Sequence, residues 1–563
     1  MRRPPTGRRC ALSLVAALTL SVVMALALAL ALAACAPDGG AINNAPGDTA
    51  QLGSALASQQ VLTRGIDAGA VRSLDPSIAT DIPAERVLDD IFEGLTRLDQ
   101  AGEPAPGLAT HWETSSDGRT WTFHLRAANW SNGEPITAAD FVYAWRRTCD
   151  PRTASDYGQA LAAVLNAVDI NEGRAAPETL GVEAPDEHTV VVRLNAPTPY
   201  LLSLLTKAYA APQYAPVIAA QGENWTLPSQ LISNGAFVLR EHLIGGRITL
   251  AKNPRYWNAA QVRLQTVVYL PLDRAVQTDR FFAGELSFTD SFSAEQTAWL
   301  RRRLGSQVVS APYLGNFVLG VNALRPPFAG NRPLRLALSM AVDRETLVRY
   351  VRQGLYKPAW TPTPPLPGYA APIPAWATLP EAERHLQARR LYQQAGYSSR
   401  HPLHIELHYP TDSDNRRTYE AVAAMWRMNL GAEVSTYNEE FRVQLNERHL
   451  KKLQLFHYAW IGDYPDPYTF LQLFQTGFGY NDGGYSNPHY DQLLARAGAQ
   501  SNATQRLALL AEAEALLDED VACIPLYYYA SRHLIKSYLR GWTSNIQDRN
   551  LSQYMYVLEH QGR

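Results

Sequence analysis

The chain has 563 residues, of which 46% are hydrophobic, and its formal net charge is −2. Lysine and arginine are spread along the chain without a basic block, which argues against nucleic acid as a partner. About 500 residues remain after the N-terminal signal described next, too many for one hydrophobic core, so two or three domains are expected.

Residues 1–35 have the pattern of an export signal. Four arginines precede an uncharged run of leucine and alanine from Ala11 to Ala34, and small residues stand directly before Cys35. Leu-Ala-Ala-Cys resembles a bacterial lipobox, which implies cleavage before Cys35 and attachment of lipid to its sulfur. A retained transmembrane helix is the alternative, because the run is long enough to span a bilayer. Residues 36–58 contain many small residues with proline and glycine, and are predicted to be a flexible tether.

The first half of the remaining chain is expected to alternate short strands and helices. Asp81 has the position of an N-cap before an amphipathic helix that ends near Gly94. Thr137 and Asp140 have the spacing of a capping box before a second helix. Further strands are predicted at 120–126, 187–194, 248–250 and 266–271, and further helices at 199–205 and 279–287.

The second half has the same mixed character. A helix at 416–430 is expected to turn Ala421, Met425 and Met428 inward. The proline-rich segment 358–374 is predicted to be an ordered, extended loop. Other predicted strands are 313–322, 404–409 and 523–529, and other predicted helices are 332–342, 382–395 and 503–518.

The most informative turn follows a buried strand predicted at 452–460. Gly462 and two prolines must stop this strand, so Asp463 is held at its end, beside Trp460 and Tyr464. A partly desolvated carboxylate needs a cation to stay ionised, and the ammonium of a ligand would serve. The alternative is that Asp463 is a turn residue that bonds its own backbone.

Motifs along nearly the whole mature chain resemble those of the oligopeptide-binding proteins of ABC peptide importers, which are extracellular solute-binding proteins of family 5, cluster C. The motifs are long and specific. They are SLDP to EGL at 73–95, DGRTWTFHLR at 117–126, WSNGEPITAADFVYAWRR at 130–147, NGAF at 234–237, KNPRYW at 252–257, WIGDYPDPYTFLQLF at 460–474 and GGYSNPHYDQLL at 483–494.

The resemblance implies an α/β (α+β) fold of the two-lobed periplasmic-binding-protein kind, type II, with an extra subdomain. Mixed sheets would be joined by two hinge strands near Leu314 and Tyr529. On this basis the predicted divisions are 59–92 with 221–314 and 530–563 for lobe I, 93–220 for the extra subdomain and 315–529 for lobe II.

The resemblance also implies a peptide site between the lobes. Asp463 would receive the α-amino group of the peptide, and Arg448 its terminal carboxylate. His457, Asn415 and Arg416 are assigned to the carboxylate or the far end of a longer peptide. Histidine stands at 457 where the family has an arginine, which leaves the preferred peptide length and the pH dependence open. The residues assigned to the cleft wall and to pairing with the peptide main chain are Thr80, Ile82, Tyr157, Phe441, Trp460 and Tyr528; for Tyr157, packing is the alternative.

Two cysteines remain in the predicted mature domain. Cys149 and Cys523 are far apart in sequence, and two buried free thiols are favoured over a disulfide. In several members of the family a different disulfide ties the strand of Asp463 to the strand at 313–322. The matching positions here are Gly315 and Ile461, so both cysteines of that bridge are missing together.

Other functions fit the sequence less well. His404, Glu406 and His408 share one face of a strand and could hold a metal, but the solvated face of an edge strand is favoured. There is no Gly-x-Ser-x-Gly, HExxH or P-loop motif, and prolines fix Asp463 and Asp466 in one turn, which suits a glycosidase poorly. We therefore expect no enzyme.

The predicted function is that of a monomeric, lipid-anchored solute-binding protein in the periplasm or on the cell surface, without cofactor or metal. It would capture short peptides in a closing cleft and deliver them to the transmembrane subunits of an ABC permease. The alternatives are a receptor of the same fold for dipeptides, murein peptides or another specialised ligand such as nickel or a sugar, including a signalling receptor, and, more remotely, a secreted hydrolase.

Overall fold

The computed structural model describes residues 53–68, 71–155, 161–411 and 413–560. The predicted signal peptide with Cys35, most of the predicted tether, and Tyr157 lie outside the described residues. Among the described residues, we find no helix with the length and apolar character needed to cross a membrane.

A mixed four-stranded sheet has the order β1-β10-β9-β8. Its strands are β1 (Val61–Ile66), β8 (Phe237–His242), β9 (Ile248–Lys252) and β10 (Thr266–Pro271). Strand β1 is parallel to β10, and the other pairs are antiparallel. Helix α2 (Ile82–Ile91) packs near β8, and the Asp81 side chain caps it by accepting from the Ala84 amide at 2.7 Å. The predicted helix start is therefore confirmed.

An antiparallel four-stranded sheet has the order β4-β5-β7-β6. Its strands are β4 (Ala109–Thr114), β5 (Thr120–Leu125), β6 (Val182–Asp186) and β7 (Thr189–Arg193). Helix α3 (Ala138–Cys149) begins with the capping box predicted at Thr137 and Asp140, and contacts β6 and β7. The remaining elements of this part are β2 (Thr96–Leu98), β3 (Pro104–Pro106), α4 (Ala167–Asn171), α5 (Leu201–Leu204) and α6 (Ala215–Gln221).

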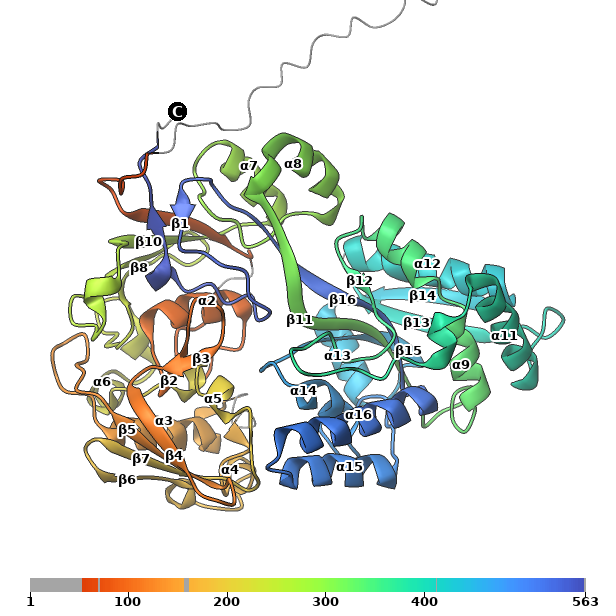
Figure 1. Cartoon of the computed structure of the whole chain (residues 1–563), viewed down its shortest axis with the longest axis horizontal. Helices are drawn as coiled ribbons and strands as arrows, with labels where there is room; N and C mark the ends of the chain where they lie inside the picture. Colours follow the sequence, from red (N-terminus) through yellow and green to blue (C-terminus); the bar gives the residue numbers. More distant parts are fainter. Residues whose placement is uncertain (1–52, 69–70, 156–160, 412, 561–563) are drawn as a thin grey trace, which may run out of the picture. The chain divides into compact units, whose positions relative to one another are not determined.

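A six-stranded sheet has the order β12-β16-β11-β15-β13-β14. Its strands are β11 (Val308–Val321), β12 (Lys357–Pro358), β13 (His404–Pro410), β14 (Glu433–Glu439), β15 (Leu455–Ile461) and β16 (Cys523–Leu534). The long strands β11 and β16 run side by side (Figure 1), paired antiparallel with a shift in register between Pro312 and Asn316. This irregularity includes Leu314, where the sequence predicted a hinge.

Further helices follow β10 in the chain, and the structure corrects three expectations. They are α7 (Arg274–Phe282), α8 (Thr297–Leu304), α9 (Arg332–Met340), α10 (Arg344–Thr346), α11 (Glu381–Gln394), α12 (Ser413–Leu430), α13 (Phe441–His449), α14 (Tyr468–Leu471), α15 (Pro488–Ala499) and α16 (Ala503–Asp520). Helix α7 begins five residues before its predicted start. Met428 is 78% exposed, so its predicted inward orientation was wrong, and α12 buries Val422 and Trp426 instead. Strand β13 is interior, because β14 forms the sheet edge, so the edge position expected for His404, Glu406 and His408 was also wrong.

The main hydrophobic cores are built on the faces of the large sheets. One core contains buried residues of both four-stranded sheets, such as Leu62 of β1 and Phe123 of β5. Two further cores flank the six-stranded sheet, one around Phe317 and Trp426 and the other around Val318 and Phe470. Cys149 and Cys523 are buried and free.

Candidate functional site

The turn after β15 holds Asp463 in place. The Gly462 amide donates to the Leu314 carbonyl oxygen at 2.8 Å, and the Asp463 amide donates to Thr469 Oγ1 at 3.4 Å. Asp466 stabilises the turn, because its carboxylate accepts from Arg506 in two hydrogen bonds of 2.6 and 3.0 Å. The Asp463 carboxylate, by contrast, has no hydrogen bond or ion pair with another described residue. Asp466 Oδ1 also accepts from the Tyr468 amide at 2.9 Å, so the turn role considered for Asp463 belongs to Asp466.

Asp463 lines a cavity of about 200 Å³. Thr80 and Ile82, which the sequence placed in the cleft wall, line the same cavity. The other lining residues come from the start of α2, from the segment after α5, from β11 and β15 and from the chain near its C-terminus; they are Pro76, Ala79, Glu85, Arg86, Leu88, Asp89, Lys207, Ala208, Tyr209, Tyr313, Ile461, Gly462, Gln547 and Arg549.

The electrostatics of this cavity centre on Asp463. The Asp463 side chain is exposed to the solvent within the cavity. The cavity walls nevertheless surround it and displace most of the bulk water, and this desolvation raises the pKa of the carboxyl group to about 6. The charge of Lys207 acts to lower this pKa, and the charge of Glu85 acts to raise it. A ligand cation placed on Asp463 would stabilise its ionised form.

Thr80 offers an unpaired backbone edge in the same cavity. Among the described residues, no backbone hydrogen bond involves its amide or its carbonyl group. Thr80 is exposed, and Asp81 after it caps α2. An extended ligand could therefore pair with the main chain at this position, as a strand added to an edge does.

The residues predicted for the peptide carboxylate lie elsewhere. Arg448 is buried and is 2.5 Å from Asp482 through Nε, and its Nη1 donates to the His457 carbonyl oxygen at 3.2 Å. His457 is also buried, and its Nδ1 lies 2.7 Å from Tyr419 Oη. Desolvation, followed by the charge of Arg448, lowers the pKa of His457 to about 3, so its ring is neutral at neutral pH. Arg448 and His457 are thus brought together, but neither lines the cavity of Asp463.

The remaining predicted site residues are dispersed. Asn415 and Arg416 lie in the first turn of α12, and Arg416 is 3.7 Å from Glu420. Phe441 is 52% exposed at the start of α13. Trp460 is half-buried and its Nε1 donates to Thr469 Oγ1 at 3.2 Å.

Tyr528 lines a second cavity. This cavity has a volume of about 550 Å³ and includes the proline-rich segment 364–367. Tyr528 Oη donates to the Thr361 carbonyl oxygen at 2.9 Å. Tyr313 of β11 lines both cavities.

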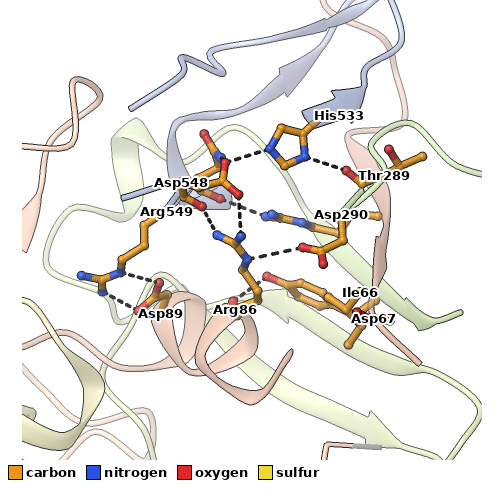
Figure 2. A network of polar contacts seen from close by, with 12 residues as sticks. Ile66, Asp67, Arg86, Asp89, Thr289, Asp290, His533, Asp548 and Arg549 are labelled. Atoms are coloured by element: carbon orange, nitrogen blue, oxygen red, sulfur yellow. Dashed lines mark hydrogen bonds and ion pairs between the residues drawn. The ribbon is translucent and has the colours of Figure 1, made fainter. Parts of the chain in front are cut away.

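Sequence reasoning missed the charged residues that line the first cavity beside Asp463. Lys207 Nζ donates to Glu85 Oε1 at 2.5 Å, although the two residues are 122 positions apart. Arg549 binds Asp89 in two hydrogen bonds of 2.6 and 3.0 Å (Figure 2). These side chains follow no local motif, so only the tertiary structure brings them together.

The predicted family disulfide positions are adjacent in the structure. Gly315 of β11 and Ile461 of β15 are direct partners in the antiparallel ladder. A Cβ added to Gly315 would lie 2.7 Å from Ile461 Cδ1. The two positions therefore have the proximity that a bridge between these strands requires.

Comparison with known proteins defines the class. Residues 103–482 match the family described as bacterial extracellular solute-binding proteins, family 5 Middle, and the chain belongs to this family. It is 37% identical over 515 residues to the periplasmic murein peptide-binding protein of Escherichia coli strain K12, a match that covers 90% of this chain and 95% of that protein. It is 35% identical over 515 residues to the periplasmic oligopeptide-binding protein of the same strain, covering 90% and 94%.

Solved structures agree with this assignment. The structure of the murein tripeptide binding protein of Escherichia coli superposes with a TM-score of 0.80 at 36% identity, covering 90% of this chain and all of that one. The predicted fold class, a two-lobed solute-binding protein of type II with mixed sheets, is therefore confirmed.

Proposed function

We propose that this chain is an extracytoplasmic receptor that captures short peptides and delivers them to an ABC permease. The relatives named above are periplasmic proteins that bind oligopeptides or murein peptides. The observation that carries the proposal for this chain is the Asp463 carboxylate, which lines a cavity, has no partner in the described part of the chain and has a pKa raised to about 6. Such a group is suited to bind the α-ammonium of a peptide.

Recognition would depend on the two charged ends and the main chain of the peptide, so that different side chains are accepted between the ends. Asp463 binds the ammonium, and the free amide and carbonyl of Thr80 pair with the main chain, which gives affinity independent of sequence. Arg448 remains the proposed partner of the carboxylate. Because Asp482 already neutralises Arg448, the peptide carboxylate must share or displace that ion pair.

Closure and anchoring complete the proposal. Lobes with the predicted boundaries would close around the irregular pairing of β11 and β16, and the closed form would dock on the permease. Cys35, cleaved and lipidated, would hold the monomeric protein at the membrane through the segment 36–58. No cofactor is required for capture or delivery.

The direct test is calorimetric titration of the protein from residue 36 onward with Ala-Ala-Ala and with its N-acetylated form at pH 7, where Asp463 and the peptide ammonium are both charged. We expect binding of the free peptide and a large loss of affinity on acetylation, because acetylation removes the ammonium. Equal affinity for both forms would contradict recognition of the amino end. Absence of binding to any short peptide, with a specialised ligand bound instead, would favour a receptor for murein peptides or another compound.

A further inference from the structure

The wall of the Asp463 cavity carries three cationic side chains, those of Arg86, Lys207 and Arg549. A ligand that fills this cavity must meet them as well as Asp463. Which of them can bind a ligand anion depends on how many of their N–H donors the protein already uses.

Both arginines are already engaged (Figure 2). Arg549 makes two hydrogen bonds to Asp89 and two to Thr206, all between 2.6 and 3.0 Å. Arg86 is buried, donates to Asp548 Oδ2 at 2.8 Å, and lies 3.5 Å from Asp290. Asp548 itself is held by the buried His533 at 2.8 Å. Arg86 Nε meets no hydrogen-bond acceptor among the described residues, but it is buried and faces Asp290, so its charge is neutralised within the protein.

Lys207 is different. Its ammonium donates to Glu85 at 2.5 Å, and its two other protons meet no acceptor among the described residues. Its side chain is mostly covered, with 14% exposed, and lines the cavity. Lys207 therefore has both free donors and access to a ligand.

The three carboxylates in the wall of the cavity also differ in whether a protein cation already binds them. Asp89 is used by Arg549, and Glu85 is used by Lys207 and lies 3.7 Å from Arg549. Only Asp463 among them has no partner within the described chain. The cavity thus offers the Asp463 carboxylate as an acceptor for a cation, and Lys207, the least buried of the three cationic side chains, as a donor for an anion.

We propose that Lys207, held by Glu85, is a second ionic subsite that binds an acidic side chain on the first or second residue of a peptide whose ammonium lies on Asp463. The inference rests on the proposed function and adds a side-chain preference to it. Because the cavity is only about 200 Å³, the second carboxylate must come from a residue close to the amino end.

The test compares isosteric peptides by calorimetry at pH 7, where both Asp463 and the peptide ammonium are mostly ionised. Glu-Ala-Ala is compared with Gln-Ala-Ala, and Ala-Glu-Ala with Ala-Gln-Ala. Each pair shares the same C-terminal carboxylate, so any difference isolates the side-chain charge. We expect the glutamate peptide to bind about tenfold more tightly at one of the two positions, as one charge-assisted hydrogen bond allows.

Three variants assign this preference to Lys207. Lys207→Gln should abolish the preference, and Lys207→Arg should retain it because the positive charge remains. Lys452→Gln, a change at a half-exposed lysine outside the cavity, should leave the ratio unchanged and serves as the matched control.

The possible results distinguish failure of the Lys207 subsite from failure of the proposed peptide-binding function. If Ala-Ala-Ala binds but glutamate and glutamine peptides bind equally at both positions, the subsite is refuted and the peptide receptor stands. A preference that persists in Lys207→Gln also refutes it. If none of the peptides binds, including Ala-Ala-Ala, the proposed function fails and the subsite fails with it.

Discussion

Replacing Asp463 with asparagine should remove the free negative charge of the cavity while keeping the shape of the side chain. The Asp463 carboxylate has no partner to lose among the described residues, so the change should weaken ligand binding without lowering the free energy of unfolding. Hydrogen bonds to charged groups contribute about 1.5–3 kcal/mol, which corresponds to an affinity loss of roughly 10- to 150-fold for Ala-Ala-Ala. Asp463 is exposed to solvent, which screens its charge, so the loss of binding free energy should stay within this range and below that of a fully buried ion pair.

A double-mutant cycle isolates the interaction with the ammonium. Affinities are measured by calorimetry at pH 7 for the wild type and Asp463→Asn, each with Ala-Ala-Ala and its N-acetylated form. Acetylation should weaken binding strongly in the wild type and only slightly in the variant, because the two groups act together. Glu512→Gln, at an exposed carboxylate of α16, is the matched control and should bind both peptides as the wild type does.

Two results would refute this reasoning. The first is an unchanged affinity for Ala-Ala-Ala in Asp463→Asn. The second is additive losses, in which acetylation costs the variant as much as the wild type, since the ammonium would then lie on another group.

Three further predictions follow from the same geometry. Peptide affinity should be highest near pH 7 and should fall by up to tenfold per pH unit below about pH 6, because the ammonium binds the ionised form of Asp463, whose pKa is raised to about 6; a flat calorimetric profile from pH 4 to 7 would contradict this. Gly315→Cys with Ile461→Cys should form a disulfide that stabilises the fold by about 2–4 kcal/mol, measured as a thermal transition that reductant lowers; identical oxidised and reduced transitions would count against it. Asp466→Asn should destabilise the protein by about 3–5 kcal/mol in urea unfolding, because it leaves the buried Arg506 without its partner; an unchanged midpoint would contradict that role.

Local signals in the sequence were sufficient for several elements. The Asp81 cap and the capping box at Thr137 depend on residues within one helical turn, and both are present in the structure. The place of Asp463 at a strand end followed from Gly462 and the prolines after it. The resemblance to a known family identified Gly315 and Ile461 as partners, which the strand register confirms.

The remaining features depend on the tertiary structure. Strand order is not encoded locally, so β13 was expected at an edge although β14 covers it. The spacing of Met425 and Met428 fits one helical face, but the packing surface of α12 is centred on Val422 and Trp426, which leaves Met428 exposed. The ion pair of Lys207 and Glu85 joins segments that are distant in sequence, so no local sequence pattern predicts it.

The most direct test of the central claim is native mass spectrometry of the protein from residue 36 onward, purified without denaturation, with the released ligand sequenced. The account predicts a mixture of short peptides with free amino ends that is lost in Asp463→Asn. A single small compound in the wild type, or an empty protein that ignores added peptides, would contradict it.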